Sequence, residues 1–226
     1  MKHLPIILLR YLIATLGLAL VAVGVALSLK SNLGTAPISC PPAVLNLRFS
    51  GISVGTFTWM MHLVLILFQL VLLRSKFRLV YLMQIPAAFV FGYLCDAAIW
   101  ACAALPAGSY GWQLLWSLAA VVVTAIGLRI EVLANAWMIA GDKATQVLAE
   151  VSGAAFSNVK VCFDVFFVLV ASAFALIVFG HFFGDGSHNV IREGTLILAL
   201  FTGLCMKLTD PLVCAAWHKC FPRGMC

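Results

Sequence analysis

The sequence predicts an all-α, polytopic membrane protein of six transmembrane helices, on the strength of its composition, its charge-free runs and an internal repeat. Hydrophobic residues make up 64% of the 226 residues and charged residues 10%, and the mean hydropathy is +1.10. A water-soluble domain carries about 25% charged residues. This composition excludes a soluble globular domain and predicts that the chain lies in a lipid bilayer.

The charge-free runs give the number of spans, because a helix needs about 20 apolar residues to cross a hydrocarbon core of about 30 Å. No charge occurs between Asp96 and Arg129, but a Pro- and Gly-containing turn at 105–111 divides this run into two spans. The first run is too long for a cleavable signal peptide, so we interpret it as a true span. The predicted spans are 7–29, 52–74, 79–104, 112–137, 156–182 and 189–213.

The distribution of Lys and Arg predicts the orientation, because cytoplasmic segments retain positive residues. With the N-terminus inside, only Lys30, Arg48 and Arg192 fall on the outer side. We therefore expect both termini on the cytoplasmic side of a bacterial inner membrane. The net charge of +6 reflects this bias. Since the basic residues are scattered over the helix ends, no nucleic-acid partner is expected.

An internal repeat organises the chain. Leu-Gly-Thr-Ala-Pro at 33–37 corresponds to Ala-Gly-Asp-Lys-Ala at 140–144 with an offset of 107, and 91–96 corresponds to 202–207 with an offset of 111. The expected units are repeat one at 1–105, repeat two at 106–213 and a cytoplasmic tail at 214–226. Three spans per repeat would invert the second copy in the membrane, as in many secondary transporters, with short re-entrant or interfacial helices after the first and fourth spans. The alternative is a coincidence of small residues, which are frequent in membrane helices.

Several of these residues together resemble the YczE/YyaS/YitT group of bacterial membrane proteins, over about residues 12 to 210. The most specific pieces are the Lys-x-x-x-Asp of Lys160 and Asp164 and the Glu-Gly-Thr that begins at Glu193. The resemblance implies a polytopic inner-membrane protein and a transporter without a settled substrate. Lys207 and the Cys-bearing tail depart from the pattern. The other matching segments are 33–37, Gly51, Gly55-Thr56, 141–143, 159–164, 192–195 and Gly203.

Charges inside the predicted spans are functional candidates, because a charge at the centre of a membrane helix costs about 2.5 to 3.5 kcal/mol on insertion scales. Glu131 shares a helical face with Thr124, Gly127 and Asn135. We hypothesise that this face lines a central cavity with Glu131 as its main acidic group and Asn135 beside it. The matching face of the first span carries Gly17, Leu20, Gly24 and Ser28. The small residues on this face would allow close backbone approach.

Lys160 and Asp164 lie one helical turn apart. They form either a structural ion pair near the cytoplasmic interface or a coupling centre in which a carboxylate exchanges its partner for a proton or a substrate ammonium. Thr35 and Asp142 lie at the breaks after the first and fourth spans, where they can cap short helices. Such breaks mark binding sites in transporters, but plain interfacial helices have the same pattern.

Three further charges, Asp96, Glu193 and Lys207, are candidates for gates or for structural charges. Asp96 and Lys207 have opposite sign at equivalent repeat positions, which would suit two gates on either side of a central site. No hydrolase or phosphate-loop motif occurs, and the cysteine spacing fits no common zinc pattern, so we expect neither an enzyme nor a metal or cofactor.

The function predicted from these observations is secondary transport of a small polar or amphipathic metabolite by alternating access. The expected substrate or ion-binding residues are Glu131, Asn135, Lys160, Asp164, Thr35 and Asp142. The expected partners are the lipid bilayer, a small-molecule substrate and either a second copy or an energy-coupling protein. Two alternatives stay open: a substrate-binding membrane subunit, which would co-purify with an ATPase module, and a non-transporting accessory factor, which would have a dry and fully paired core.

Overall fold

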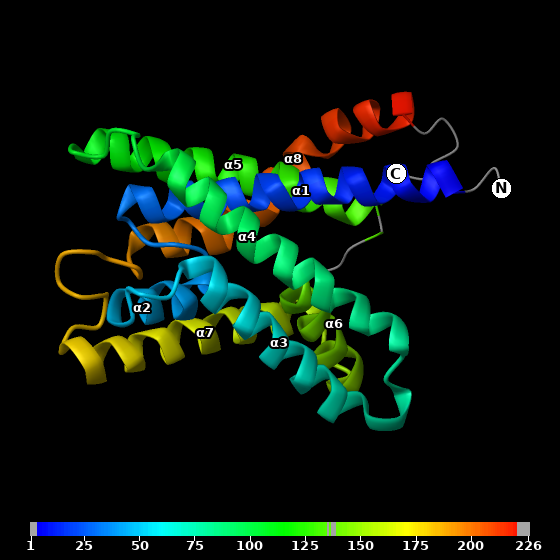
Figure 1. Cartoon of the computed structure of the whole chain (residues 1–226), viewed down its shortest axis with the longest axis horizontal. Helices are drawn as coiled ribbons and strands as arrows, with labels where there is room; N and C mark the ends of the chain where they lie inside the picture. Colours follow the sequence, from blue (N-terminus) through cyan, green and yellow to red (C-terminus); the bar gives the residue numbers. More distant parts are fainter. Residues whose placement is uncertain (1–3, 135, 137–138, 221–226) are drawn as a thin grey trace.

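The computed structural model describes residues 4–134, 136 and 139–220, and its regular structure there is helical (Figure 1). Six helical segments are long and apolar enough to cross a membrane, which confirms the predicted fold class. Within these residues the single β-bridge joins Gly184 and Asn189. The candidate spans are Ile7–Ser31, Val54–Leu73, Leu79–Cys102, Tyr110–Ala134, Asn158–Phe179 and Glu193–Ala215.

The helix ends have local causes in the sequence. The Ser53 hydroxyl accepts a hydrogen bond from the Thr56 N–H and caps α3. Gly153 and Gly180 adopt positive φ angles of 70° and 73° and end α6 and α7. The helices are α1 (Leu4–Ser31), α2 (Cys40–Arg48), α3 (Val54–Leu73), α4 (Gln84–Cys102), α5 (Tyr110–Ala134), α6 (Ala140–Ser152), α7 (Phe156–Phe179) and α8 (Glu193–Cys220), with 3₁₀ turns η1 (Pro37–Ser39), η2 (Arg74–Lys76) and η3 (Leu79–Met83).

Two predicted boundaries differ from the structure. The last span begins at Glu193 instead of 189, because the preceding loop folds back through hydrogen bonds from Val190 N–H to the Phe183 carbonyl. It then continues through Pro211 as helix to Cys220, so the expected tail at 214–226 starts within α8. Trp217 explains this extension, since it packs beside Ala14 and Ala134 in one apolar cluster.

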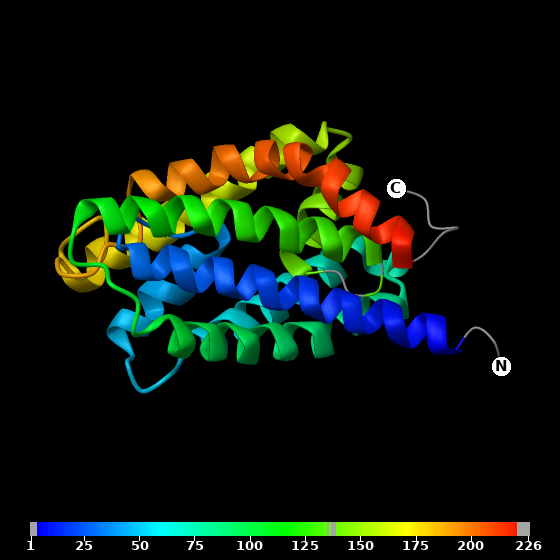
Figure 2. The same cartoon turned by 90° about the horizontal axis from the view of Figure 1, so that it is seen from above.

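Helices α1 and α5 form the centre of the bundle, where they lie side by side and run in opposite directions (Figure 2). A Cβ atom added at Gly17 would lie 2.9 Å from the Gly127 carbonyl oxygen, and Gly24 lies against Thr124 in the same interface. Small residues therefore allow the close backbone approach that the sequence predicts. The same contact fills the face that we hypothesised to line a cavity.

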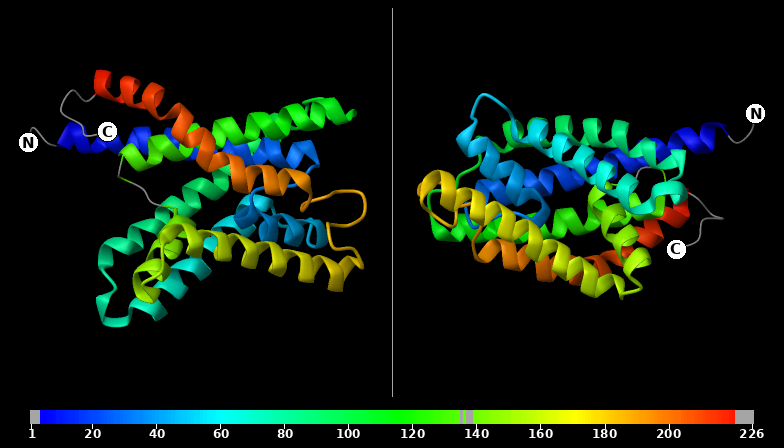
Figure 3. Two further views of the ribbon diagram at one scale, coloured as in Figure 1. Left: turned by 180° about the vertical axis from the view of Figure 1, so that it is seen from behind. Right: turned by 90° about the horizontal axis from the view of Figure 1, so that it is seen from below.

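The short helices α2 and α6 both begin in the interior of the protein and run outward to opposite ends of the bundle (Figures 1 and 3). Their beginnings meet, because the Ile38 side chain in η1 occupies the space where Gly141 would carry a side chain. Helix α2 packs against α3 and α7, and α6 packs against the same two helices. Each short helix is thus held between the first and the second half of the chain.

Contacts between helices correspond in the two halves. Helix α1 packs on α4 as α5 packs on α8, and α2 packs on α7 as α6 packs on α3. One contact has no counterpart: α3 packs extensively on α4, but no comparable contact joins α7 and α8 within the described residues. The span of α8 is accordingly the least covered of the six.

Candidate functional site

A charged cluster lies where α6 and α7 meet, and it contains three of the predicted site residues. The Lys160 ammonium donates to Asp164 Oδ1 at 3.0 Å and lies 3.7 Å from Asp142 Oδ1. Asp142 belongs to the first turn of α6, and the other two residues face it from α7. The side chain of Asp164 is 16% exposed and that of Lys160 33%, so the cluster is partly covered by protein. One lysine therefore serves two carboxylates.

Glu131 is the fourth predicted residue of this region, and it contacts the segment just before α6. Its Oε1 accepts a hydrogen bond of 2.9 Å from the Ile139 N–H, so the carboxyl group lies at the N-terminal end of that helix. The residue is 5% exposed. Its Oε2 is buried and has no hydrogen-bond partner among the described residues. Asn135, which the sequence predicts beside Glu131, lies outside the described residues.

A buried pair of amide side chains, not predicted from the sequence, also binds the start of α6. Gln69 on α3 and Gln84 at the start of α4 exchange two hydrogen bonds of 3.1 Å. Gln69 also donates to the Ala140 carbonyl at 3.2 Å. The beginning of α6 is therefore held by two hydrogen bonds, one from the Ile139 N–H to Glu131 and one from Gln69 to the Ala140 carbonyl. The sequence does contain a signal for this pair, because two glutamines within apolar spans each need a hydrogen-bond partner.

Thr35 lies apart from the charged cluster, at the break before η1. Its hydroxyl lies 2.7 Å from the Ser28 hydroxyl on α1, and its N–H donates to the Val190 carbonyl at 3.0 Å. The neighbouring Leu33 carbonyl accepts from the Gly194 N–H at 2.8 Å. The Leu-Gly-Thr and Glu-Gly-Thr motifs, far apart in sequence, thus contact each other directly.

Cys40 at the start of α2 completes this polar region. Its Sγ lies 3.7 Å from the Thr35 carbonyl and 3.8 Å from the Val190 carbonyl. Burial raises the pKa of the Cys40 thiol to about 12. The thiol therefore stays neutral at physiological pH and acts here as a weak hydrogen-bond donor.

The three candidate gate charges have different surroundings. Asp96 on α4 accepts a hydrogen bond of 2.6 Å from the Ser53 hydroxyl and one of 2.7 Å from the Gly55 N–H, so it caps α3 from a neighbouring helix. Glu193 forms a bidentate pair with Arg192 at 2.8 and 3.0 Å. Lys207 lies on an exposed face of α8 and forms no ion pair within the described residues.

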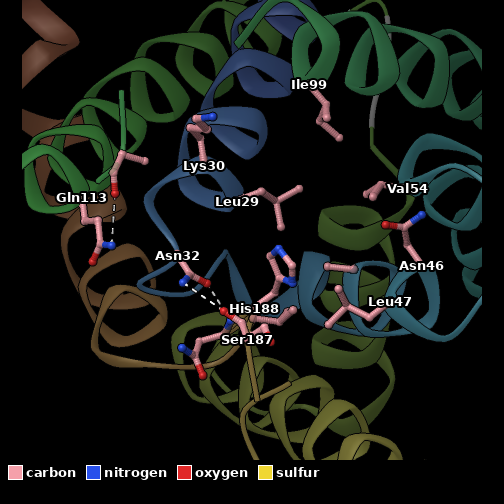
Figure 4. Close-up of a pocket in the computed structure, with 14 residues that line it drawn as sticks. Leu29, Lys30, Asn32, Asn46, Leu47, Val54, Ile99, Gln113, Ser187 and His188 are labelled. Carbon is pink, nitrogen blue, oxygen red and sulfur yellow. Dashed lines mark hydrogen bonds between the residues drawn. The ribbon is translucent and has the colours of Figure 1, made fainter. Parts of the chain in front are cut away.

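A cavity of about 470 Å³ lies at the end of the bundle where α1 terminates (Figure 4). Its surface is mostly apolar, with Leu29 and Ile99 in its wall, while Lys30, Asn32, Gln113 and His188 supply polar groups. A second cavity of about 620 Å³ lies between α7 and the start of α8, beside Arg192 and Glu193. The lining residues of these two cavities do not include Glu131 or the Lys160 cluster.

No group of three or more His, Cys, Asp or Glu side chains in the described part of the chain is arranged to hold a metal ion. The polar groups are instead distributed over two sites, one at the start of each short helix. The fold and these sites define a membrane-embedded helical protein with two interior helix ends and charged residues beside one of them.

Comparison with known proteins places the chain in a family. It belongs to a family of unknown function, DUF6198, whose model matches residues 8–211. No curated protein and no solved structure matches the chain. The family match extends from the first span into the last, and the narrower resemblance to the YczE/YyaS/YitT group stays a prediction.

Proposed function

We propose that the protein is a secondary carrier of a small polar or amphipathic metabolite in the bacterial inner membrane, with both termini in the cytoplasm. One observation carries the proposal: the beginnings of two short helices, one from each half, meet inside the protein beside the ion pairs of Lys160. Interrupted helices whose ends meet near the membrane centre form the substrate sites of many carriers.

The paired helix contacts support two inverted repeats. Helices α1 and α5 run in opposite directions, the α1–α4 contact corresponds to α5–α8, and the α2–α7 contact corresponds to α6–α3. Carriers built in this way change access when their halves exchange conformations. The lack of a comparable α7–α8 contact within the described residues supports one motion, in which α8 closes on α7 while α4 separates from α3.

The charged cluster supplies the means of binding. Lys160 is shared by Asp142 and Asp164, so a solute ammonium group can pair with one carboxylate while Lys160 stays paired with the other. The cavity beside Lys30 and His188 would serve as the entrance from the outer side.

Uptake into proteoliposomes tests the proposal. The reconstituted protein is exposed to a mixture of small polar metabolites, and the contents are analysed by mass spectrometry. We expect the wild type to accumulate at least one solute. The uptake of that solute by Lys160→Met should be more than tenfold lower. Lys143→Met is the matched control, because Lys143 contacts Gln146 and the Tyr81 ring instead of the cluster.

Gly203→Trp tests the motion. Nothing lies within 4 Å of a Cβ atom at Gly203, so the substitution should leave the thermal unfolding temperature unchanged. If α8 closes on α7, the indole blocks closure and abolishes uptake. Normal uptake by this variant would contradict the proposed motion.

An energy-coupling or accessory partner is the second candidate, favoured by Lys207 on the exposed face of α8. A lysine facing lipid is costly unless it reaches the headgroups or pairs with another chain. If the wild type transports no solute but retains a membrane partner in native mass spectrometry, and Lys207→Leu releases that partner, the carrier proposal is replaced by this one.

A further inference from the structure

In the described structure, only one of the two carboxyl oxygens of Glu131 accepts a hydrogen bond. The residue is 5% exposed and Oε1 accepts one hydrogen bond from the Ile139 N–H, whereas the buried Oε2 accepts none from the part of the chain that the structure describes. An ionised carboxylate in this position lacks the hydrogen bonds that normally compensate for loss of water. The buried oxygen therefore indicates a site for a positively charged ligand.

The charges around Glu131 are unfavourable to its anion. Asp142 on α6 lies within electrostatic reach of Glu131, and the lysine that faces Asp142, Lys160, is already shared with Asp164. Fully ionised, these three acids and one lysine would carry two excess negative charges. One added positive charge at Glu131 reduces that repulsion.

Other charged groups on the packed elements point elsewhere. Arg129 on α5 forms an ion pair with Asp210 on α8, and Lys143 on α6 contacts Gln146 and the Tyr81 ring. On α1, Gly17 faces the Glu131 backbone, and no ion pair joins Arg10 of that helix to Glu131 in the described chain. No ion pair in the described chain therefore neutralises Glu131.

The burial of Glu131 favours the smallest cation. The residue is 5% exposed, and it is not among the lining residues of the two cavities described above. A proton needs no such space, whereas an organic ammonium or a hydrated metal ion does.

We propose that Glu131 is a proton-binding site whose proton exchanges with water during the working cycle. On uptake, a proton passes from hydronium to Oε2, an O–H bond forms, water is released and the carboxylate becomes neutral. The opposing influence is the N-terminal end of α6, which favours the anion through the Ile139 N–H. Release of the proton strengthens that attraction and links the charge of Glu131 to the position of α6. In the proposed carrier this proton would be the coupling ion, and that last step alone rests on the proposed function.

Infrared spectroscopy of the purified protein over a pH series tests the proton site without any substrate. We expect a carbonyl-stretch band of a buried protonated carboxylic acid that disappears as the pH rises. The band should be absent in Glu131→Gln and present in Glu150→Gln, the matched control, because Glu150 is an exposed acid on α6 bonded to Gln146.

A second variant keeps the test decisive if Glu131→Gln does not fold. Asp142→Asn removes the neighbouring negative charge, so the midpoint of the band should move to lower pH. A band that persists in Glu131→Gln, an unchanged midpoint in Asp142→Asn, or a wild-type band that does not titrate in the folded protein would each overturn the proposal.

The outcomes separate the two proposals. A titrating Glu131 band in a protein that moves no solute keeps the proton site and removes the carrier. Solute uptake that is unchanged in Glu131→Gln, together with no titrating band, keeps the carrier and removes the proton site.

Discussion

The third and fourth helices of the chain are joined closely, whereas their counterparts α7 and α8 are not. In the first half Gly55 and Gly92 bring the backbones of α3 and α4 into contact, and Asp96 bonds to the start of α3. In the second half the position equivalent to Gly92 is Gly203, which has open space beside it. Equivalent glycines therefore lie at a helix contact in one half and beside open space in the other, so a glycine alone does not decide which helices pack.

The largest effect on this difference should come from Gly55→Val. A Cβ atom at Gly55 would collide with the Gly92 carbonyl and the Asp96 carboxylate, so the variant should lose about 3 kcal/mol of stability by overpacking. Gly203→Val, at the position equivalent to Gly92, should change stability by less than about 0.5 kcal/mol. Thermal unfolding in detergent measures both, and equal losses would mean that α7 and α8 are also packed in solution.

Asp96→Ala should have the next largest effect. It removes a charged acceptor from the Ser53 hydroxyl and the Gly55 N–H, a loss of about 2 kcal/mol. Lys207→Ala at the equivalent position of α8 removes no described ion pair and should be nearly neutral. Denaturation of the two variants side by side checks the comparison, and a stable Asp96→Ala protein would refute the capping role.

The buried amides should show a coupled effect. Gln69→Leu or Gln84→Leu alone leaves the other amide buried without its partner and should cost about 1 to 3 kcal/mol. Since the double variant leaves neither amide, it should lose less than the sum of the two single changes. Thermal unfolding of all three proteins measures this coupling, and simple additivity would mean that the pair does not join α3 to α4.

The smallest effect is expected in the loop between α7 and α8. Partial burial raises the pKa of Asp185, but hydrogen bonds from the His188 and Ser187 N–H groups outweigh it and leave the pKa below its usual range. The ionised carboxylate therefore stabilises the loop above the usual Asp pKa of about 3.9, and this contribution is lost as the pH falls through the lowered pKa.

Hydrogen exchange of the Ser187 and His188 amides, corrected for intrinsic rates, checks this expectation. Protection should decrease at acidic pH in the wild type and be low and nearly independent of pH in Asp185→Asn. Equal protection in both proteins would show that the carboxylate does not hold the loop that separates α7 from α8.

Local patterns predicted most of this fold. Charge-free runs located six spans, and the spacing of Lys160 and Asp164 gave a direct ion pair. The small residues at Gly17 and Gly24 gave the close α1–α5 contact. The sequence patterns that predict these features each lie within one helix, so a single sequence contains enough information to find them.

Partners far apart in the chain could not be predicted in this way. Asp96 bonds to groups more than 40 positions earlier, and Arg129 pairs with Asp210 on another span. The sequence contains the polar residue in each case but not the crossing of the helices that selects its partner. For the same reason the sequence located Glu131 but not its bond to Ile139.

The position of the short helices also constrains how the chain is assembled during synthesis. Helix α2 rests against α7, and α6 rests against α3, so each half supplies part of the surface that shelters the other half's short helix. Residues 37–48 can therefore acquire their final neighbours only after α7 has been synthesised. Expressed as two separate chains, the halves should be degraded singly and recovered as a stable pair when they are made together.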